Sequence, residues 1–100
     1  MVNIDKTDMG FRLSGVLSVS NAKDVLVSGN DILRKIEGEF VTIDFSLITS
    51  LDSSAISLML EWLRVGEACG KTINFKGLSS SFESLIEVYG LAQVLPLGTE

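Results

Sequence analysis

The fold is decided by residues 40–69, which read FVTIDFSLITSLDSSAISLMLEWLRVGEAC. Residues 40–45 are mostly β-branched or aromatic, a composition typical of a central β-strand. From Ser54 to Cys69 the apolar residues recur at helical spacing, and Gly70 then supplies a left-handed stop. A strand that leads through a short turn into such a helix predicts an α/β domain.

The residues before this stretch predict a hairpin and a helix. Residues 2–6 and 11–17 are expected to form two short strands, because residues 7–10 between them supply turn chemistry. A helix is then expected from Ser20, as its N-cap, to about Ile36.

The residues after it predict one more strand and one more helix. Residues 72–75 are expected to be the strand, and SSFE at residues 80–83 has the pattern of a capping box that opens the helix. Gly90 ends this helix, and Val94 and Leu95 are expected to form a short final strand. The whole chain is therefore predicted to be a single α/β domain of 100 residues, a mixed sheet with helices packed on it, in the order β-β-α-β-α-β-α.

Composition excludes several classes of function. The chain has 8 Lys and Arg against 13 Asp and Glu, so its formal charge is 8 − 13 = −5. This acidity argues against nucleic acid as a partner, since phosphate backbones attract clustered cations. The absence of histidine and the single cysteine remove the His triad, the His or Cys-rich metal site and the internal disulfide. We therefore expect no catalytic residues, no metal and no cofactor.

A membrane span is not expected either. Asp44, Asp52 and Glu61 interrupt the most apolar region of the chain, whereas a span needs about 20 consecutive apolar residues. We consequently expect no direct insertion into a membrane.

The central helix carries more apolar surface than one sheet requires. At 100° per residue, its apolar side chains cover an arc of roughly 220°, whereas about 100° suffices for an ordinary amphipathic helix. The additional apolar surface is expected to pack on a neighbouring helix, most simply the third. Alternatively, one margin of this surface faces a partner. Along the opposite side run Ser53, Ser57, Leu60 and Arg64, a line with one leucine expected to be exposed. Mixed polar and apolar surfaces of this kind are typical of protein interfaces.

The turn Leu51-Asp52-Ser53-Ser54-Ala55 precedes this helix and permits two interpretations. Asp52 or Ser53 is a natural N-cap, because its side-chain oxygen can accept from the free amides of the first turn. Alternatively, a serine hydroxyl at the positive end of a helix dipole could carry a phosphate, which backbone amides would hold. Such a phosphate would add about −1.5 to −2 charge at an interface and act as a binding switch.

Three other residues have ordinary structural interpretations. Asp44 could be paired with Asp52 as two carboxylates, but neither a glycine cradle nor further ligands accompany them. Cys69 is expected to be a buried, inert thiol, and Trp62 a partly buried core residue with a smaller chance of anchoring a partner.

The sequence resembles STAS domains over nearly its whole length. The resemblance rests on LSGVL at residues 13–17, IDFS at 43–46, LDSSA at 51–55 and VYGL at 88–91. STAS domains include the anti-sigma-factor antagonists, in which the residue after the loop Asp is phosphorylated by a serine kinase. That position corresponds to Ser53, and Ala55 departs from the family's usual glycine.

The chain is most similar to the small STAS subunit of the Mla phospholipid-transport ABC transporter. This similarity implies a non-catalytic cytoplasmic subunit, peripheral to the inner membrane through its partner. The partner would be the ATPase subunit, and the expected contact residues are the loop and the start of the central helix: Asp52, Ser53, Ser54, Ser57, Leu60 and Arg64. The alternative is an anti-sigma-factor antagonist, whose partners would be an anti-sigma factor and serine kinase acting on Ser53.

Overall fold

The computed structural model describes residues 2–96. Its seven elements follow the predicted order β-β-α-β-α-β-α. Their bounds are β1 Val2–Thr7, β2 Gly10–Leu17, α1 Ala22–Lys35, β3 Phe40–Leu51, α2 Ser54–Ala68, β4 Thr72–Lys76 and α3 Ser80–Val88.

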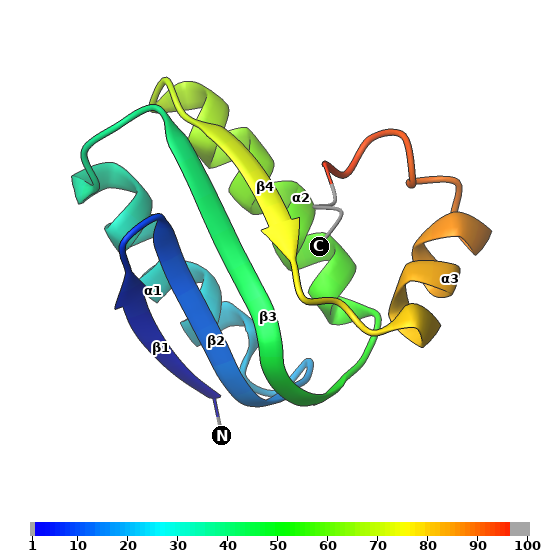
Figure 1. The fold of residues 1–100 in the computed structure, drawn as a ribbon. Helices are drawn as coiled ribbons and strands as arrows, with labels where there is room; N and C mark the ends of the chain where they lie inside the picture. Colours follow the sequence, from blue (N-terminus) through cyan, green and yellow to red (C-terminus); the bar gives the residue numbers. More distant parts are fainter. Residues whose placement is uncertain (1, 97–100) are drawn as a thin grey trace.

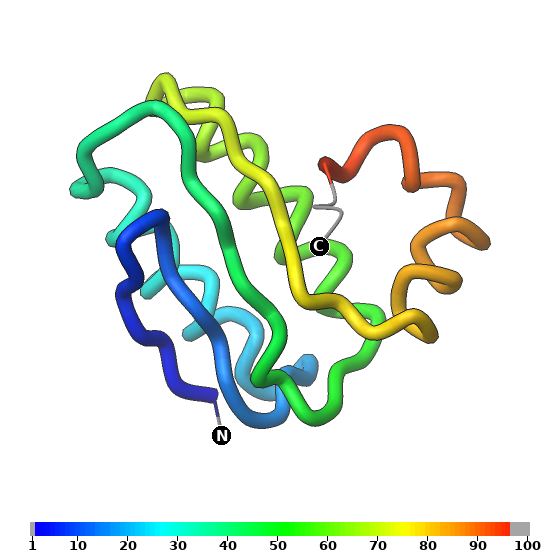
Figure 2. Tube along the Cα trace, in the orientation of Figure 1, coloured from blue at the N-terminus to red at the C-terminus, as the bar shows by residue number. Residues whose placement is uncertain are grey.

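The strands form one mixed sheet in the order β1-β2-β3-β4. β1 and β2 pair antiparallel as a hairpin, and β3 runs parallel to both β2 and β4. Figure 1 shows α1 and α2 together on one face of the sheet, while α3 lies to the side beyond β4. The trace in Figure 2 then returns from α3 toward β4 and α2. The mixed sheet predicted from the alternation of strands and helices is confirmed.

The core lies between the sheet and the helix pair α1 and α2. Alternate residues of β2, of the first half of β3 and of β4 point into it, including Phe11, Ile43 and Phe75, each fully buried. Trp62 of α2 is also fully buried, and its ring meets that of Phe11 edge to face at a centroid distance of 5.2 Å. An aromatic pair of this geometry contributes about 0.5–1.5 kcal/mol beyond its buried area.

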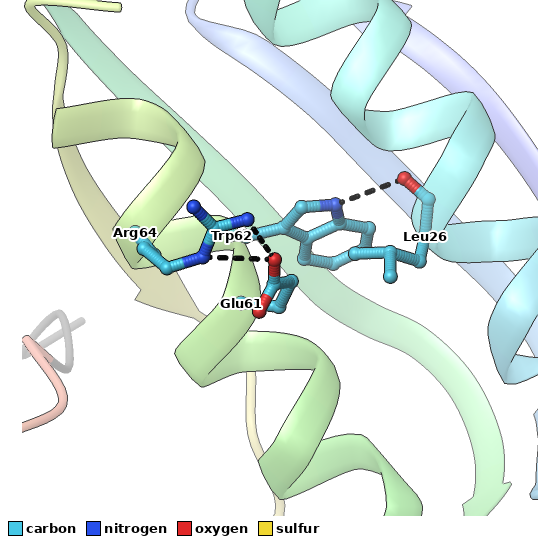
Figure 3. A network of polar contacts seen from close by, with 4 residues as sticks. All are labelled: Leu26, Glu61, Trp62 and Arg64. Atoms are coloured by element: carbon cyan, nitrogen blue, oxygen red, sulfur yellow. Dashed lines mark hydrogen bonds and ion pairs between the residues drawn. The ribbon is translucent and has the colours of Figure 1, made fainter. Parts of the chain in front are cut away.

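The helix that covers the excess apolar surface of α2 is α1, not the third helix as the sequence suggested. Trp62 packs against the backbone of Gly29 in α1, where an added Cβ would lie only 2.4 Å from the indole Cζ2. The indole N–H also donates to the carbonyl of Leu26 at 3.4 Å, as Figure 3 shows. Glycine is required here because two helices cross too closely for any side chain.

The central strand is longer than predicted. β3 covers Phe40–Leu51 rather than residues 40–45, because β2 continues to pair with it up to the partners Leu17 and Leu51. The pairing shifts register between Arg12 and Ser14 and between Gly15 and Val16, and each shift places one extra residue in β3. Because residues 46–50 include serine and threonine, the hydropathy pattern did not predict that they belong to the strand.

Two helix starts are also shifted by one residue. α1 has Asn21, not Ser20, at its N-cap, and the Asn21 side chain bridges the preceding loop by accepting from the N–H of Ser18. α3 is capped by Ser79, whose hydroxyl accepts from the N–H of Phe82, so SSFE is not the capping box itself.

The predicted final strand does not form. Val94 and Leu95 lie in turn structure, and Leu95 is buried in the core. The segment touches the sheet through one backbone bond, from the N–H of Phe75 to the carbonyl of Pro96 at 2.9 Å. Within residues 2–96 no helix is both long enough and apolar enough to cross a membrane.

Candidate functional site

Asp52 joins two loops at the end of the sheet. One carboxylate oxygen accepts from the backbone N–H of Val19, in the loop after β2, at 3.2 Å. The other accepts from both the backbone N–H and the hydroxyl of Ser54, at the start of α2. The hydroxyl and amide of Ser54, with the amide of Val19, lower the pKa of Asp52 below its usual value. Ser53 holds the N-cap position of α2 but makes no side-chain cap, so the carboxylate of Asp52, one residue earlier, supplies the bond to the first turn.

Ser53 is free for contact with a partner. Its side chain makes no capping hydrogen bond, and it is exposed with a helical backbone conformation, φ −66° and ψ −14°. Its neighbour Ser54 is half-buried and bonded to Asp52. Of the two hydroxyls at the helix start, only that of Ser53 is both exposed and outside the Asp52 network. This geometry fits either interpretation of the turn.

The line along α2 is only partly the surface that the sequence suggested. Ser57 and Arg64 are exposed, but Leu60 is half-buried and packs against the core, so the expected exposed leucine is not there. On the helix surface Leu60 adjoins Ile56 and Leu63, which are buried and half-buried, so it lies at the margin of the buried face of α2.

Arg64 is held by its own helix. It forms an ion pair with Glu61 one turn earlier, seen in Figure 3, and this bond lowers the pKa of Glu61. A partner that used Arg64 would compete with this intrahelical pair, which is weak because water screens it at an exposed site.

Exposed aliphatic residues that sequence reasoning missed lie on β2, on β3 and in the loop that Asp52 holds. Val19 is 77% exposed although its N–H is bound to Asp52. Val16 on β2 and Leu47 on β3 are 42% and 53% exposed, and they pair with Ser50 and Ser14 of the neighbouring strand. Because the exposed side chain of Val19 accompanies the exposed hydroxyl of Ser53, the surface around Asp52 has the mixed polar and apolar composition common in protein interfaces.

A groove of about 500 Å³ lies beside these loops, between the far half of β3 and the start of α3. Gly77 shapes it, since a Cβ there would lie 2.5 Å from the N–H nitrogen of Ser46. With φ at +79°, Gly77 lets the loop after β4 lie directly against β3. The sequence signal for this feature is the glycine that follows the last strand.

The remaining candidates do not join this site. Asp44 is buried and belongs to a separate network, in which it accepts from Arg12 at 3.1 Å and from the N–H of Ser46 at 2.8 Å. Trp62 is fully buried and cannot anchor a partner, and Cys69 is half-buried rather than buried. Among residues 2–96 no three acidic or cysteine side chains gather closely enough to hold a metal ion.

The mixed four-stranded sheet, with three helices in the order β-β-α-β-α-β-α, defines the SpoIIAA-like fold of STAS domains. The chain belongs to the family described as "Mlab, STAS domain", whose model matches residues 1–97. A search of curated proteins gave no significant match.

Solved structures share the fold at low sequence identity. The anti-sigma-factor antagonist SpoIIAA in its unphosphorylated form superposes with a TM-score of 0.74 at 16% identity, covering 100% of this chain and 90% of that one. An anti-sigma-factor antagonist (STAS) domain protein from Planctomyces limnophilus gives 0.71 at 15%, covering 99% and 91%. The STAS domain of a SulP transporter from Vibrio cholerae gives 0.57 at 10%, covering 85% and 73%.

Proposed function

We propose that this protein is a non-catalytic subunit that binds and regulates the ATPase subunit of an Mla-type phospholipid ABC transporter. The observation that carries the proposal is the family match over residues 1–97, which is to the Mlab type of STAS domain. The accessible surface around Ser53 supports it, because that surface offers a protein partner hydroxyls and aliphatic side chains. In this role the protein lies in the cytoplasm, held at the inner membrane by its partner.

The contact surface in this proposal is the start of α2 with the two loops joined by Asp52. Ser53 and Ser57 contribute exposed hydroxyls, and Val19 contributes an exposed aliphatic side chain. Ser54 and Asp52 hold the loops in place rather than contacting the partner through free groups. Leu60 adds only its exposed edge, and Arg64 lies at the far end of the line.

Co-expression with the cognate Mla-type ATPase subunit tests the proposal. We expect a stable complex on size-exclusion chromatography and a changed rate of ATP hydrolysis. Ser53→Asp should weaken the complex about tenfold or more, because substitutions near the centre of an interface commonly have effects of this size. Ser28→Asp, an exposed serine on α1, is the matched control and should leave the complex unchanged. Absence of any complex with the wild-type protein would contradict the proposal.

A second candidate, an anti-sigma-factor antagonist, is favoured by the free hydroxyl of Ser53 beside the start of α2. A phosphate there would meet the positive end of the helix and place negative charge on the contact surface. The test is incubation with the serine kinase encoded nearby and ATP. This candidate requires one phosphate on Ser53 of the wild type and none on Ser53→Ala.

A further inference from the structure

The groove beside α3 has an apolar floor and no charged lining residue. Phe45 and Phe82 form its floor and are both buried. Four half-buried aliphatic side chains form its walls: Ile48, Leu51, Leu78 and Leu85. None of the residues that line it is charged, although charged residues make up 21% of the chain.

The groove extends from the end of β3, next to the candidate contact surface, to Leu85 in α3. At one end it includes Ser50 and Leu51, which directly precede Asp52. At the other, Val88 and Tyr89 follow Leu85 at helical spacing i+3 and i+4, and they are 78% and 52% exposed. Apolar surface therefore continues from the groove along α3 and is open to solvent.

The charges around the groove are mostly negative. Residues 44–63 and 76–96, which supply its lining, include Asp44, Asp52, Glu61, Glu83 and Glu87 and a single cation, Lys76. The field at this end of the domain is therefore negative, and it attracts a cationic partner and repels an anionic one.

We propose that this groove docks an amphipathic helical segment of the ATPase partner, with apolar side chains on one face and Lys or Arg on its flanks. An apolar groove that receives a helix face is a recurrent mode of peptide recognition. Small-molecule pockets, in contrast, enclose about 70–90% of their ligand, whereas this groove is open along one side. The inference rests on the proposed function and adds to it a second contact, distinct from Ser53.

Two serines of α3 provide a matched test. Both Ser81 and Ser84 are exposed, but only Ser81 lines the groove. Ser81→Arg fills the groove with a cation where the proposal requires the partner's cations to lie, and Ser84→Arg makes the same chemical change one turn further along α3, at a residue that does not line the groove. We expect Ser81→Arg to weaken the ATPase complex about tenfold or more and Ser84→Arg less than about twofold.

Equal affinities of the two variants would overturn the inference while leaving the proposed function intact. Failure of the wild type to bind the ATPase would instead reject the proposed function. Because each serine is exposed, unfolding of the variants is not expected, and one-dimensional NMR of both verifies the fold.

Synthetic peptides test the chemistry of the groove without the ATPase. We would titrate the ¹⁵N-labelled protein with two 18-residue helical peptides that share one apolar face, one flanked by Lys and one by Glu. The Lys peptide should bind about tenfold more tightly and shift amide signals in residues 45–51 and 77–85. Equal binding of the two peptides, or shifts confined to other elements, would overturn the proposed docking site. Loss of the Lys-peptide shifts in Ser81→Arg, but not in Ser84→Arg, supports it.

Discussion

The backbone N–H of Val19 donates to the carboxylate of Asp52 across 3.2 Å, joining the loop after β2 to the turn before α2. The same carboxylate caps α2 through the N–H of Ser54 at 2.9 Å. One side chain thus fixes two loops relative to each other and leaves Val19 and Ser53 on the surface. The loop geometry on which the proposed contact depends is held by Asp52, which itself needs no contact with the partner.

Replacing Asp52 should loosen both loops at once. Asp52→Ala removes the acceptor for the N–H groups of Val19 and Ser54, so both should exchange hydrogen faster, with a lower melting temperature. Asp52→Asn keeps one acceptor oxygen and should have a smaller effect. Hydrogen exchange followed by NMR measures the two amides separately. Unchanged exchange at Val19 in the alanine variant would contradict a bridging role.

Gly29→Ala should destabilise the protein although alanine is the better helix former. The new Cβ would lie 2.4 Å from Cζ2 of Trp62, which has no room to move because it is fully buried. Overpacking of this kind costs about 1–3 kcal/mol, whereas the helix propensity gained is about 1 kcal/mol. Urea unfolding should therefore give a lower free energy of unfolding than wild type. Ser28→Ala, exposed on the same helix, is the control and should not lose stability.

The sequence predicted the order of elements because each has a clear local pattern. The periodicities of residues 40–45 and 54–69 and the glycine stop at Gly70, with φ at +75°, lie within single segments. The predictions that were wrong concern features that depend on contacts between segments. β3 extends to Leu51 because β2 pairs with it, and the Trp62 contact with Gly29 makes α1 the neighbour of α2. No local pattern encodes either pairing.

The same distinction applies to the candidate site. Asp52 as a cap and Ser53 as an accessible hydroxyl follow from residue types at a helix start, and the structure places them so. Whether they contact a partner stays a prediction. The exposed Val19 and the groove beside α3 depend on how loops meet, which residue spacing does not specify.

Asp44→Asn should change how stability depends on pH. The register aligns Asp5, Arg12, Asp44 and Lys76 across the four strands, with charges alternating in sign. Burial would raise the pKa of Asp44, but hydrogen bonds from Ser46 and Arg12 and the charge of Lys76 together lower it.

The direction in which stability changes with pH follows from this lowered pKa. The folded protein favours the ionised carboxylate, so its stabilisation is present above the unfolded value of about 3.9 and is lost as pH falls through the lower folded pKa. We expect Asp44→Asn to lose about 1–2 kcal/mol at pH 7, since Arg12 is partly exposed. The difference from wild type should shrink below about pH 4. Urea unfolding at several pH values measures it, and a difference that grows on acidification would contradict this assignment.

Leu60→Asp and Ser57→Asp should separate stability from binding along α2. Leu60 is half-buried against the core, so an ionised side chain there should cost about 1–3 kcal/mol of stability as well as partner affinity. Ser57 is exposed, and Ser57→Asp should keep the wild-type melting temperature while weakening the ATPase complex about tenfold. Thermal unfolding and affinity are measured on the same samples. If Ser57→Asp bound the ATPase as tightly as wild type, the outer face of α2 would lie outside the interface. The result for Leu60→Asp would not change this conclusion, because that variant alone cannot distinguish a lost contact from a damaged core.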